Sequence, residues 1–194
     1  MKTRKASITR KTLETEIELT IDLSKSGPSS IQTGIGFLDH MLTLFAFHSQ
    51  ISLEIKAKGD LEIDPHHTTE DIGICLGEAL RKALGEKTGI NRYGTALMPM
   101  DEALCQIAID ISNRPYLDFK CELPNNQIGN FDTELVQEFW LGFVNNARIT
   151  AHITQLSGKN THHIIEAIFK GFGRALRQAI KIEGDAIPSS KGML

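Results

Sequence analysis

Cysteine is scarce in this chain, with three residues among 194, and their positions exclude two kinds of cysteine-rich fold. Cys75, Cys105 and Cys121 are odd in number and show no C-x-x-C spacing. This pattern is not typical of a disulfide framework or of a zinc knuckle. We therefore expect reduced, mostly buried thiols in a cytoplasmic protein, and no thiolate metal site.

Long apolar runs and a large net charge are also missing. No apolar stretch approaches about 20 residues, so we expect no segment that spans a bilayer. A net charge of −3 gives no general attraction to nucleic acid or to an anionic membrane. The basic start, Met1–Lys5, has no apolar region behind it and does not indicate a secretory signal. The composition, 41% hydrophobic and 23% charged, is that of an ordinary globular protein.

Histidine, in contrast, is concentrated in two copies of one pattern. His-His-x-x-Glu occurs at 66–70 and again at 162–166, and the two copies use four of the seven histidines. Residues four apart share one face of a helix, so His66 and Glu70 can bind the same ion. His67 points about 100° away and is free to bind another ion. Imidazole and carboxylate together favour a divalent transition metal such as manganese, iron, nickel or zinc.

The two copies belong to a longer internal repeat. Shifting the chain by 88 residues aligns Glu14 with Glu102 and Ile21–Ser24 with Ile109–Ser112. The order of predicted elements also repeats, as strand, strand, helix, strand, helix. In the first half these are Ser7–Arg10, Thr15–Leu23, Gly36–His48, Ile51–Ala57 and Thr69–Leu84. In the second half they are Thr95–Met98, Ala103–Ile111, Thr133–Asn145, Ile149–Thr154 and Asn160–Ile180, with an additional strand, Tyr116–Glu122, expected in this half only.

Each half is too small to bury a good core alone, so we predict one α+β domain. Its parts are two repeats, at about 1–90 and 91–182, and a C-terminal tail, 183–194.

The repeat also suggests further ligands. His40 precedes His66 by 26 residues, and Glu138 stands at the corresponding place before His162. Both are polar residues within an apolar helical run, and we take both as candidate metal ligands. Basic residues that could bind an anion are Arg92, Arg114, Lys170 and Lys191. For any one of them, a solvated surface charge is the simpler interpretation.

Five segments together resemble the imidazoleglycerol-phosphate dehydratases of histidine biosynthesis. They are Gly36–Met41, Asp64–Asp71, Asp110–Tyr116, Gly158–Glu166 and Pro188–Gly192. The resemblance is collinear from about Glu14 to Gly192, and no phosphatase extension accompanies it. It implies a hydro-lyase that eliminates water from D-erythro-imidazole-glycerol phosphate and gives imidazole-acetol phosphate.

The resemblance also implies a fold like ribosomal protein S5 domain 2, with helices packed against two mixed sheets. It implies a 24-subunit particle with two Mn²⁺ ions per active site at subunit contacts. The implied metal ligands are His40, His66, His67, Glu70, His162, His163 and Glu166, with Glu138 where many members carry histidine. The implied substrate contacts are Glu14, His48, Arg92, Arg114, Lys170, Ser189 and Lys191, the last five of them toward the phosphate.

The chemistry of the implied reaction fits these residues. We expect the hydrogen that leaves to be on a carbon beside the imidazole ring, where it is not acidic, so a base alone would fail. A metal on a ring nitrogen can stabilise an imidazolate, and Glu70, Glu166 or Glu14 can move the proton. A tail that carries Ser189 and Lys191 can close over the substrate.

Two other functions use the same residues. A binuclear metallohydrolase that acts on a small phosphoester would need the same histidines and carboxylates. A metal-storage or structural-metal protein would need the ligands but not the arginines and lysines.

Overall fold

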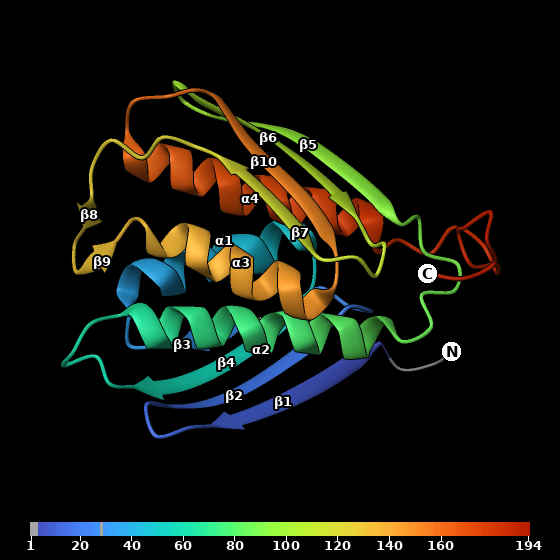
Figure 1. The fold of residues 1–194 in the computed structure, drawn as a ribbon, viewed down its shortest axis with the longest axis horizontal. Helices are drawn as coiled ribbons and strands as arrows, with labels where there is room; N and C mark the ends of the chain where they lie inside the picture. Colours follow the sequence, from blue (N-terminus) through green and yellow to red (C-terminus); the bar gives the residue numbers. More distant parts are fainter. Residues whose placement is uncertain (1–3, 28) are drawn as a thin grey trace.

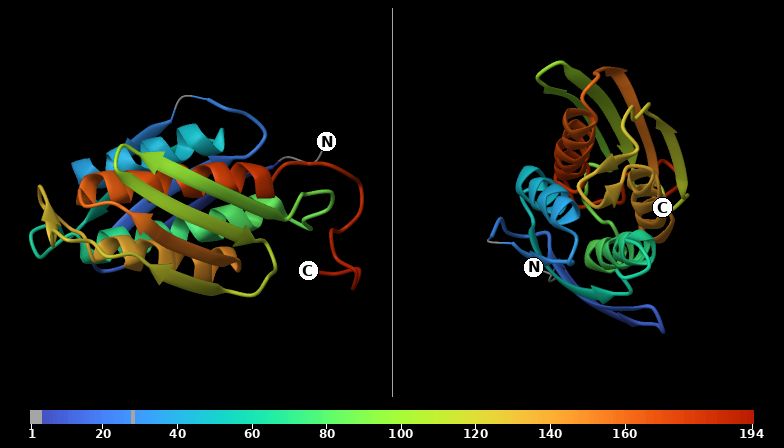
Figure 2. Two further views of the ribbon diagram at one scale, coloured as in Figure 1. Left: turned by 90° about the horizontal axis from the view of Figure 1, so that it is seen from above. Right: turned by 90° about the vertical axis from the view of Figure 1, so that its left-hand side faces the viewer.

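The repeat is visible in the layers of the molecule. The structure is a computed structural model that describes residues 4–27 and 29–194. Two four-stranded sheets form the outer layers, and four helices lie between them (Figures 1 and 2). The first half contains β1 Lys5–Lys11, β2 Thr15–Asp22, β3 Ser30–Gln32, α1 Gly36–Ser49, β4 Ser52–Gly59 and α2 His66–Leu84. The second half contains β5 Tyr93–Met100, β6 Ala103–Asp110, β7 Tyr116–Lys120, β8 Gln127–Ile128, β9 Phe131–Asp132, α3 Leu135–Ala147, β10 Thr150–Ser157 and α4 Thr161–Ala179.

The two sheets have the same strand order. The first is β1-β2-β4-β3 and the second is β5-β6-β10-β7. In each sheet the last strand is parallel to its neighbour, β3 to β4 and β7 to β10. The predicted α+β fold, with its repeated order of elements, is therefore confirmed. The expectation that Tyr116–Glu122 has no counterpart is wrong, because β3 takes the equivalent edge position. Three residues are too few to show an alternating pattern in the sequence.

Helices from different halves cross in pairs, α1 with α4 and α2 with α3. Gly77 of α2 and Gly173 of α4 lie at equivalent positions of the repeat, 96 residues apart. A Cβ on Gly77 would lie 2.4 Å from the carbonyl oxygen of Phe143, and one on Gly173 would lie 2.8 Å from that of Phe45. Only glycine permits such close backbone contact, so both crossings depend on it.

The apolar residues of both halves form one buried cluster. At its centre the Trp140 ring stacks on Phe172, with 4.0 Å between ring centroids. Cys75 and Cys105 are buried free thiols, as expected, and Cys121 is partly buried. Among the described residues, no helix is long and apolar enough to cross a membrane.

The ends of the helices decide where the candidate ligands lie. Helix α2 begins at His66, three residues before its predicted start at Thr69. Pro65 is its N-cap residue, and Asp64 precedes it. Asp64 accepts a hydrogen bond from the backbone N–H of His66 at 2.6 Å. Both His-His pairs therefore lie in the first turn of a helix. The segment 183–194 forms neither helix nor strand and lies at the opposite end of the molecule from these turns (Figure 1).

Candidate metal centre

The first turn of α4 is fixed by its capping residue. The side-chain oxygen of Asn160 accepts hydrogen bonds from the backbone N–H groups of His162 and His163, at 3.0 and 3.3 Å. Asparagine is a preferred capping residue because it satisfies N–H groups that the helix leaves free. His162 thereby faces α1, and Glu166 lies one turn further along the same face.

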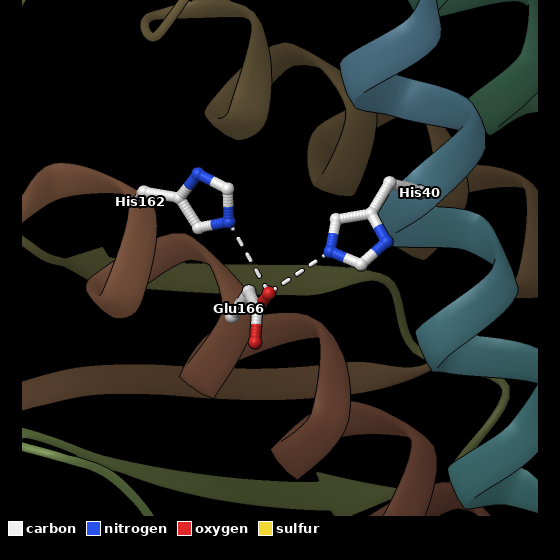
Figure 3. Close-up of side chains that lie close together, drawn as sticks. All are labelled: His40, His162 and Glu166. Atoms are coloured by element: carbon white, nitrogen blue, oxygen red, sulfur yellow. Dashed lines mark hydrogen bonds and ion pairs between the residues drawn. The ribbon is translucent and has the colours of Figure 1, made fainter.

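Three candidate ligands from both halves of the chain converge here. Nε2 of His40, on α1, lies 2.9 Å from Oε1 of Glu166, and Nε2 of His162 lies 3.2 Å from the same oxygen (Figure 3). The three ligand atoms lie within 4.8 Å of one another. Among residues 4–27 and 29–194, no other group of three or more histidine, cysteine or carboxylate side chains meets this criterion.

Glu166 is held as a carboxylate. Burial raises its pKa, but hydrogen bonds from Lys170, His40 and His162 outweigh burial and lower the pKa to about 2. Lys170, one helical turn away, contacts the second oxygen, Oε2, and also approaches the Met100 sulfur at 3.3 Å. Oε1 is therefore the oxygen that faces the two imidazoles, and Oε2 is neutralised by lysine.

This donor set fits a divalent transition metal. Imidazole nitrogens and a carboxylate oxygen at about 2.1 Å from one ion lie about 3 Å apart, close to the separations found here. The negative charge of Glu166 favours a cation. The position is accessible, since the side chains of His40 and His162 are 46% and 42% exposed.

The equivalent residues on α2 remain more open. Nε2 of His66 lies 4.0 Å from Oε2 of Glu70, and both side chains are exposed. Glu138 of α3 is partly buried. It stands 98 residues after His40, the same interval that separates Phe45 from Phe143 at the two helix crossings. Glu138 therefore lies beside α2 as His40 lies beside α4. Among the described residues, however, Glu138 does not form a three-ligand group with His66 and Glu70.

The second histidine of each pair lies outside the converged group and contacts carboxylates instead. Nδ1 of His67 lies 2.9 Å from Asp60, and its Nε2 lies 3.9 Å from Glu14. The hydrogen bond with Asp60 raises the pKa of His67. Nδ1 of His163 lies 2.7 Å from Glu102, which raises the pKa of His163. Neither histidine belongs to the converged group.

Three of the candidate anion-binding residues gather around Asp110 and the tail. Arg92 pairs with Asp110 through Nε at 2.7 Å and Nη2 at 3.1 Å, and its Nη1 donates to the carbonyl of Pro188 at 3.0 Å. Arg114 lies 3.6 Å from the same carboxylate. Ser189 follows Pro188 directly. Its Oγ accepts from the backbone N–H of Lys191 at 3.2 Å.

This basic region lies far from the histidine cluster of the same chain. The backbone N–H of Arg92 donates to the carbonyl of Ala179, the last residue of α4, whereas Glu166 is near the first. The helix from Glu166 to Ala179 is roughly 20 Å long. Lys170 and His48 belong to the histidine end instead. Burial first, and then the charges of Lys170 and Arg174, lower the pKa of His48.

The sequence pattern did not single out Asp60, Asp110 or Glu102 as functional. Asp110 begins the segment Asp110–Tyr116, which carries part of the resemblance, and Glu102 is the aligned counterpart of Glu14. Their hydrogen-bond partners lie in other segments of the chain and come close only in the folded protein.

Comparison with known proteins gives one consistent result. Residues 33–176 match the family described as imidazoleglycerol-phosphate dehydratase. Proteins of that name from Oceanobacillus iheyensis and Bacillus licheniformis are each 57% identical over 98% of this chain and 100% of their own length. The crystal structure of the Staphylococcus aureus dehydratase superposes with a TM-score of 0.85 at 48% identity, covering 92% of this chain and 99% of that one. The Pyrococcus furiosus structure gives 0.85 at 45% identity, covering 96% and 100%.

Proposed function

Because this chain belongs to the imidazoleglycerol-phosphate dehydratase family, it is a hydro-lyase of histidine biosynthesis, and we propose that each of its active sites is built from more than one chain. The substrate, imidazole-glycerol phosphate, loses water and gives imidazole-acetol phosphate. Family membership favours this activity over the metallohydrolase and over the metal-storage protein.

One observation carries the proposal. The histidine cluster and the Arg92–Arg114–Pro188 region lie at opposite ends of α4, roughly 20 Å apart. A substrate that presents its imidazole ring to one and its phosphate to the other cannot span that distance. If the phosphate end of one chain meets the histidine end of another, both groups reach one substrate. An assembly with closed symmetry makes this contact at every chain.

The candidate ligands divide in the same way. His40, His162 and Glu166 would hold one cation, and His66, Glu70 and Glu138 would hold a second. His67 and His163, which lie outside both groups, would each complete the coordination of an ion held by a neighbouring chain. We propose Mn²⁺ for both ions, two per site, in a 24-subunit particle. When bound, the ions supply Lewis acidity that stabilises negative charge on the imidazole ring.

The remaining steps belong to side chains of the protein. The product carries its ketone on the second carbon from the ring, so the proton leaves that carbon and not, as expected from the sequence, the carbon beside the ring. A carboxylate takes this proton, and the electron pair of the C–H bond forms the C=C bond of an enol. The hydroxyl on the carbon beside the ring accepts a proton and leaves as water, and the enol then tautomerises to the ketone. Glu70, Glu166 and Glu14 are the candidate bases. Glu14 fits best, because it is exposed and its only ion-pair contact in the described chain is with Nε2 of His67, at 3.9 Å.

Substrate orientation would depend on the basic residues. Arg114, Lys170, Ser189 and Lys191 offer donors to the phosphate, and His48 lies beside Lys170. Arg92 has its Nε, Nη1 and Nη2 engaged by Asp110 and Pro188, so we assign it to holding the tail near the phosphate. We place the protein in the cytoplasm, and we treat 1–194 as one domain of two repeats, about 1–90 and 91–182, with a tail at 183–194.

Metal removal tests the proposal. Exhaustive treatment with EDTA is expected to abolish dehydratase activity and to lower the sedimentation coefficient, and added Mn²⁺ is expected to restore both. Elemental analysis would confirm that the metal has been removed. Full activity or an unchanged sedimentation profile in the metal-free protein would contradict the proposal.

A further inference from the structure

The second histidines of the two pairs, His67 and His163, share an arrangement that the repeat does not account for. Nδ1 of His67 bonds to a carboxylate from the loop after β4, Asp60, at 2.9 Å. Nδ1 of His163 bonds to a carboxylate from the β5–β6 turn, Glu102, at 2.7 Å. Asp60 and Glu102 are not equivalent positions, since the counterpart of Glu102 is Glu14, which faces the other nitrogen of His67. The two halves have reached the same contact from different loops.

A carboxylate on Nδ1 fixes the tautomer of a neutral imidazole. The carboxylate only accepts hydrogen bonds, so Nδ1 must carry the proton and Nε2 keeps its lone pair. A ligating histidine needs that lone pair on the nitrogen that meets the ion. For both histidines the nitrogen left for an ion is Nε2, which lies 3.9 Å from Glu14 in His67 and 3.8 Å from Asp101 in His163, beyond hydrogen-bond distance.

We propose that Asp60 and Glu102 are positioning residues that make Nε2 of His67 and of His163 available to a cation held by a neighbouring chain. This inference rests on the proposed function, because that function assigns His67 and His163 to ions completed between chains. It names two residues that touch neither substrate nor metal.

The surroundings of Glu102 make one substitution informative. Its Oε1 accepts the backbone N–H groups of Asn160 and Lys159, at 2.8 and 3.2 Å, and its Oε2 accepts from His163. In Glu102→Gln the amide oxygen must stay on the two backbone donors. The amide NH₂ then faces Nδ1 of His163 and donates to it, which moves the imidazole proton to Nε2. A near-isosteric change therefore reverses the tautomer.

Asp60 provides the matched contrast. Its Oδ2 accepts from His67, whereas Oδ1 is buried and accepts no hydrogen bond from the described residues. No pair of backbone donors fixes the orientation of the group. In Asp60→Asn the amide can therefore keep its oxygen toward His67, whereas Asp60→Ala removes the acceptor.

The experiment measures Mn²⁺ binding by calorimetry, and imidazole tautomers by ¹⁵N NMR in metal-free protein. Glu102→Gln is expected to move the His163 proton from Nδ1 to Nε2 and to weaken one of the two Mn²⁺ sites by about 10- to 100-fold. Asp60→Ala is expected to weaken the other site by a similar factor, and Asp60→Asn to weaken it less. Glu54→Gln, which removes a carboxylate from an exposed position of β4, is the control for charge and should match the wild type.

Several results would overturn the inference. These are wild-type Mn²⁺ affinities in both Glu102→Gln and Asp60→Ala, an unmoved His163 tautomer in Glu102→Gln, or a loss of affinity that only follows a lower melting temperature of the metal-free variants. If Glu102→Gln does not fold, Asp60→Ala decides the question through His67. A wild-type protein that binds no Mn²⁺ at all would refute the proposed function instead, and the two failures are thereby distinguished.

Discussion

Nε2 of His40 lies 2.9 Å from Oε1 of Glu166, although the two residues are 126 positions apart and belong to different halves of the repeat. The contact exists because α1 crosses α4 rather than its sequence neighbour α2. Duplication alone therefore does not make a ligand group within one half; the exchange of helices between halves does.

Glu166→Gln should remove the charge of this group. Lys170 and two imidazoles would face a neutral amide, so we expect one Mn²⁺ per chain to be lost and kcat to fall by two to four orders of magnitude. Equilibrium dialysis and steady-state kinetics measure both effects. Glu134→Gln, at an exposed position before α3, is the control. Retention of two tightly bound ions would contradict the assignment of Glu166.

The division of the site between chains predicts complementation. His162→Ala removes a ligand at one end of the chain, and Arg114→Ala removes a phosphate donor at the other, so each variant alone should be nearly inactive. Particles assembled from equal amounts of both variants contain some sites with both intact partners. With random mixing, about half of the histidine ends and about half of the phosphate ends are intact. Because each site combines these two ends from different chains of a symmetric assembly, about one quarter of the sites should be active.

Two differently tagged chains, co-expressed and purified through both tags, give the mixed particles for this measurement. Mixed particles no more active than the parent variants would mean that both ends of a site come from one chain.

Glu138 is the candidate ligand whose residue type departs from the resemblance, and substitution tests it directly. Its place beside α2, equivalent to that of His40 beside α4, leads us to expect that Glu138→Ala weakens one Mn²⁺ site at least about tenfold, while Glu138→His preserves binding. Calorimetric titration compares them. Gln137→Ala changes the neighbouring exposed residue on α3 and should bind normally. Equal affinity in Glu138→Ala and the wild type would remove Glu138 from the ligand set.

The sequence predicted the repeat, the four helices and the longer strands, because apolar residues recur about every 3.6 positions on the buried face of a helix and every 2 positions on that of a strand. It also named His40, His162 and Glu166 among the candidate ligands, through the resemblance to a family, but it did not predict that these three would form one group. The edge strand β3 and the two-residue strands β8 and β9 could not be predicted, because their pairing depends on the neighbouring strand and not on their own pattern. The same holds for Asp60 and Glu102, whose hydrogen bonds to histidines form only after the loops are placed by the sheets.

The close crossings of the helices predict a stability effect. Gly173→Ala would place a methyl group 2.8 Å from the Phe45 carbonyl oxygen, and Gly77→Ala would place one 2.4 Å from that of Phe143. Both should lower the free energy of unfolding by about 1–3 kcal/mol, because the helices must separate. Gly184→Ala meets no atom within 4 Å and should change it little. Chemical denaturation of the metal-free variants measures all three, and a neutral Gly173→Ala would show that the crossing can relax.

His48 gives the clearest dependence on pH. Burial, together with Lys170 and Arg174, lowers its pKa in the folded protein below the ordinary value near 6.5. Protonation is then less favourable in the folded than in the unfolded chain. The contribution of His48 to stability is therefore complete above about pH 6.5 and declines as the pH falls through the lowered value. Arg174→Gln removes one of the neighbouring charges and should raise the pKa of His48 toward 6.5.

The rate at which diethyl pyrocarbonate modifies the neutral imidazole, followed at His48 by peptide mass spectrometry from pH 5 to 8, measures this pKa directly. The wild-type profile should have its midpoint below that of the unfolded chain, and the Arg174→Gln profile should lie between the two. A wild-type midpoint at or above 6.5 would mean that His48 is hydrated or paired with an acid. Its burial between α1 and α4 would then be the wrong account of its environment.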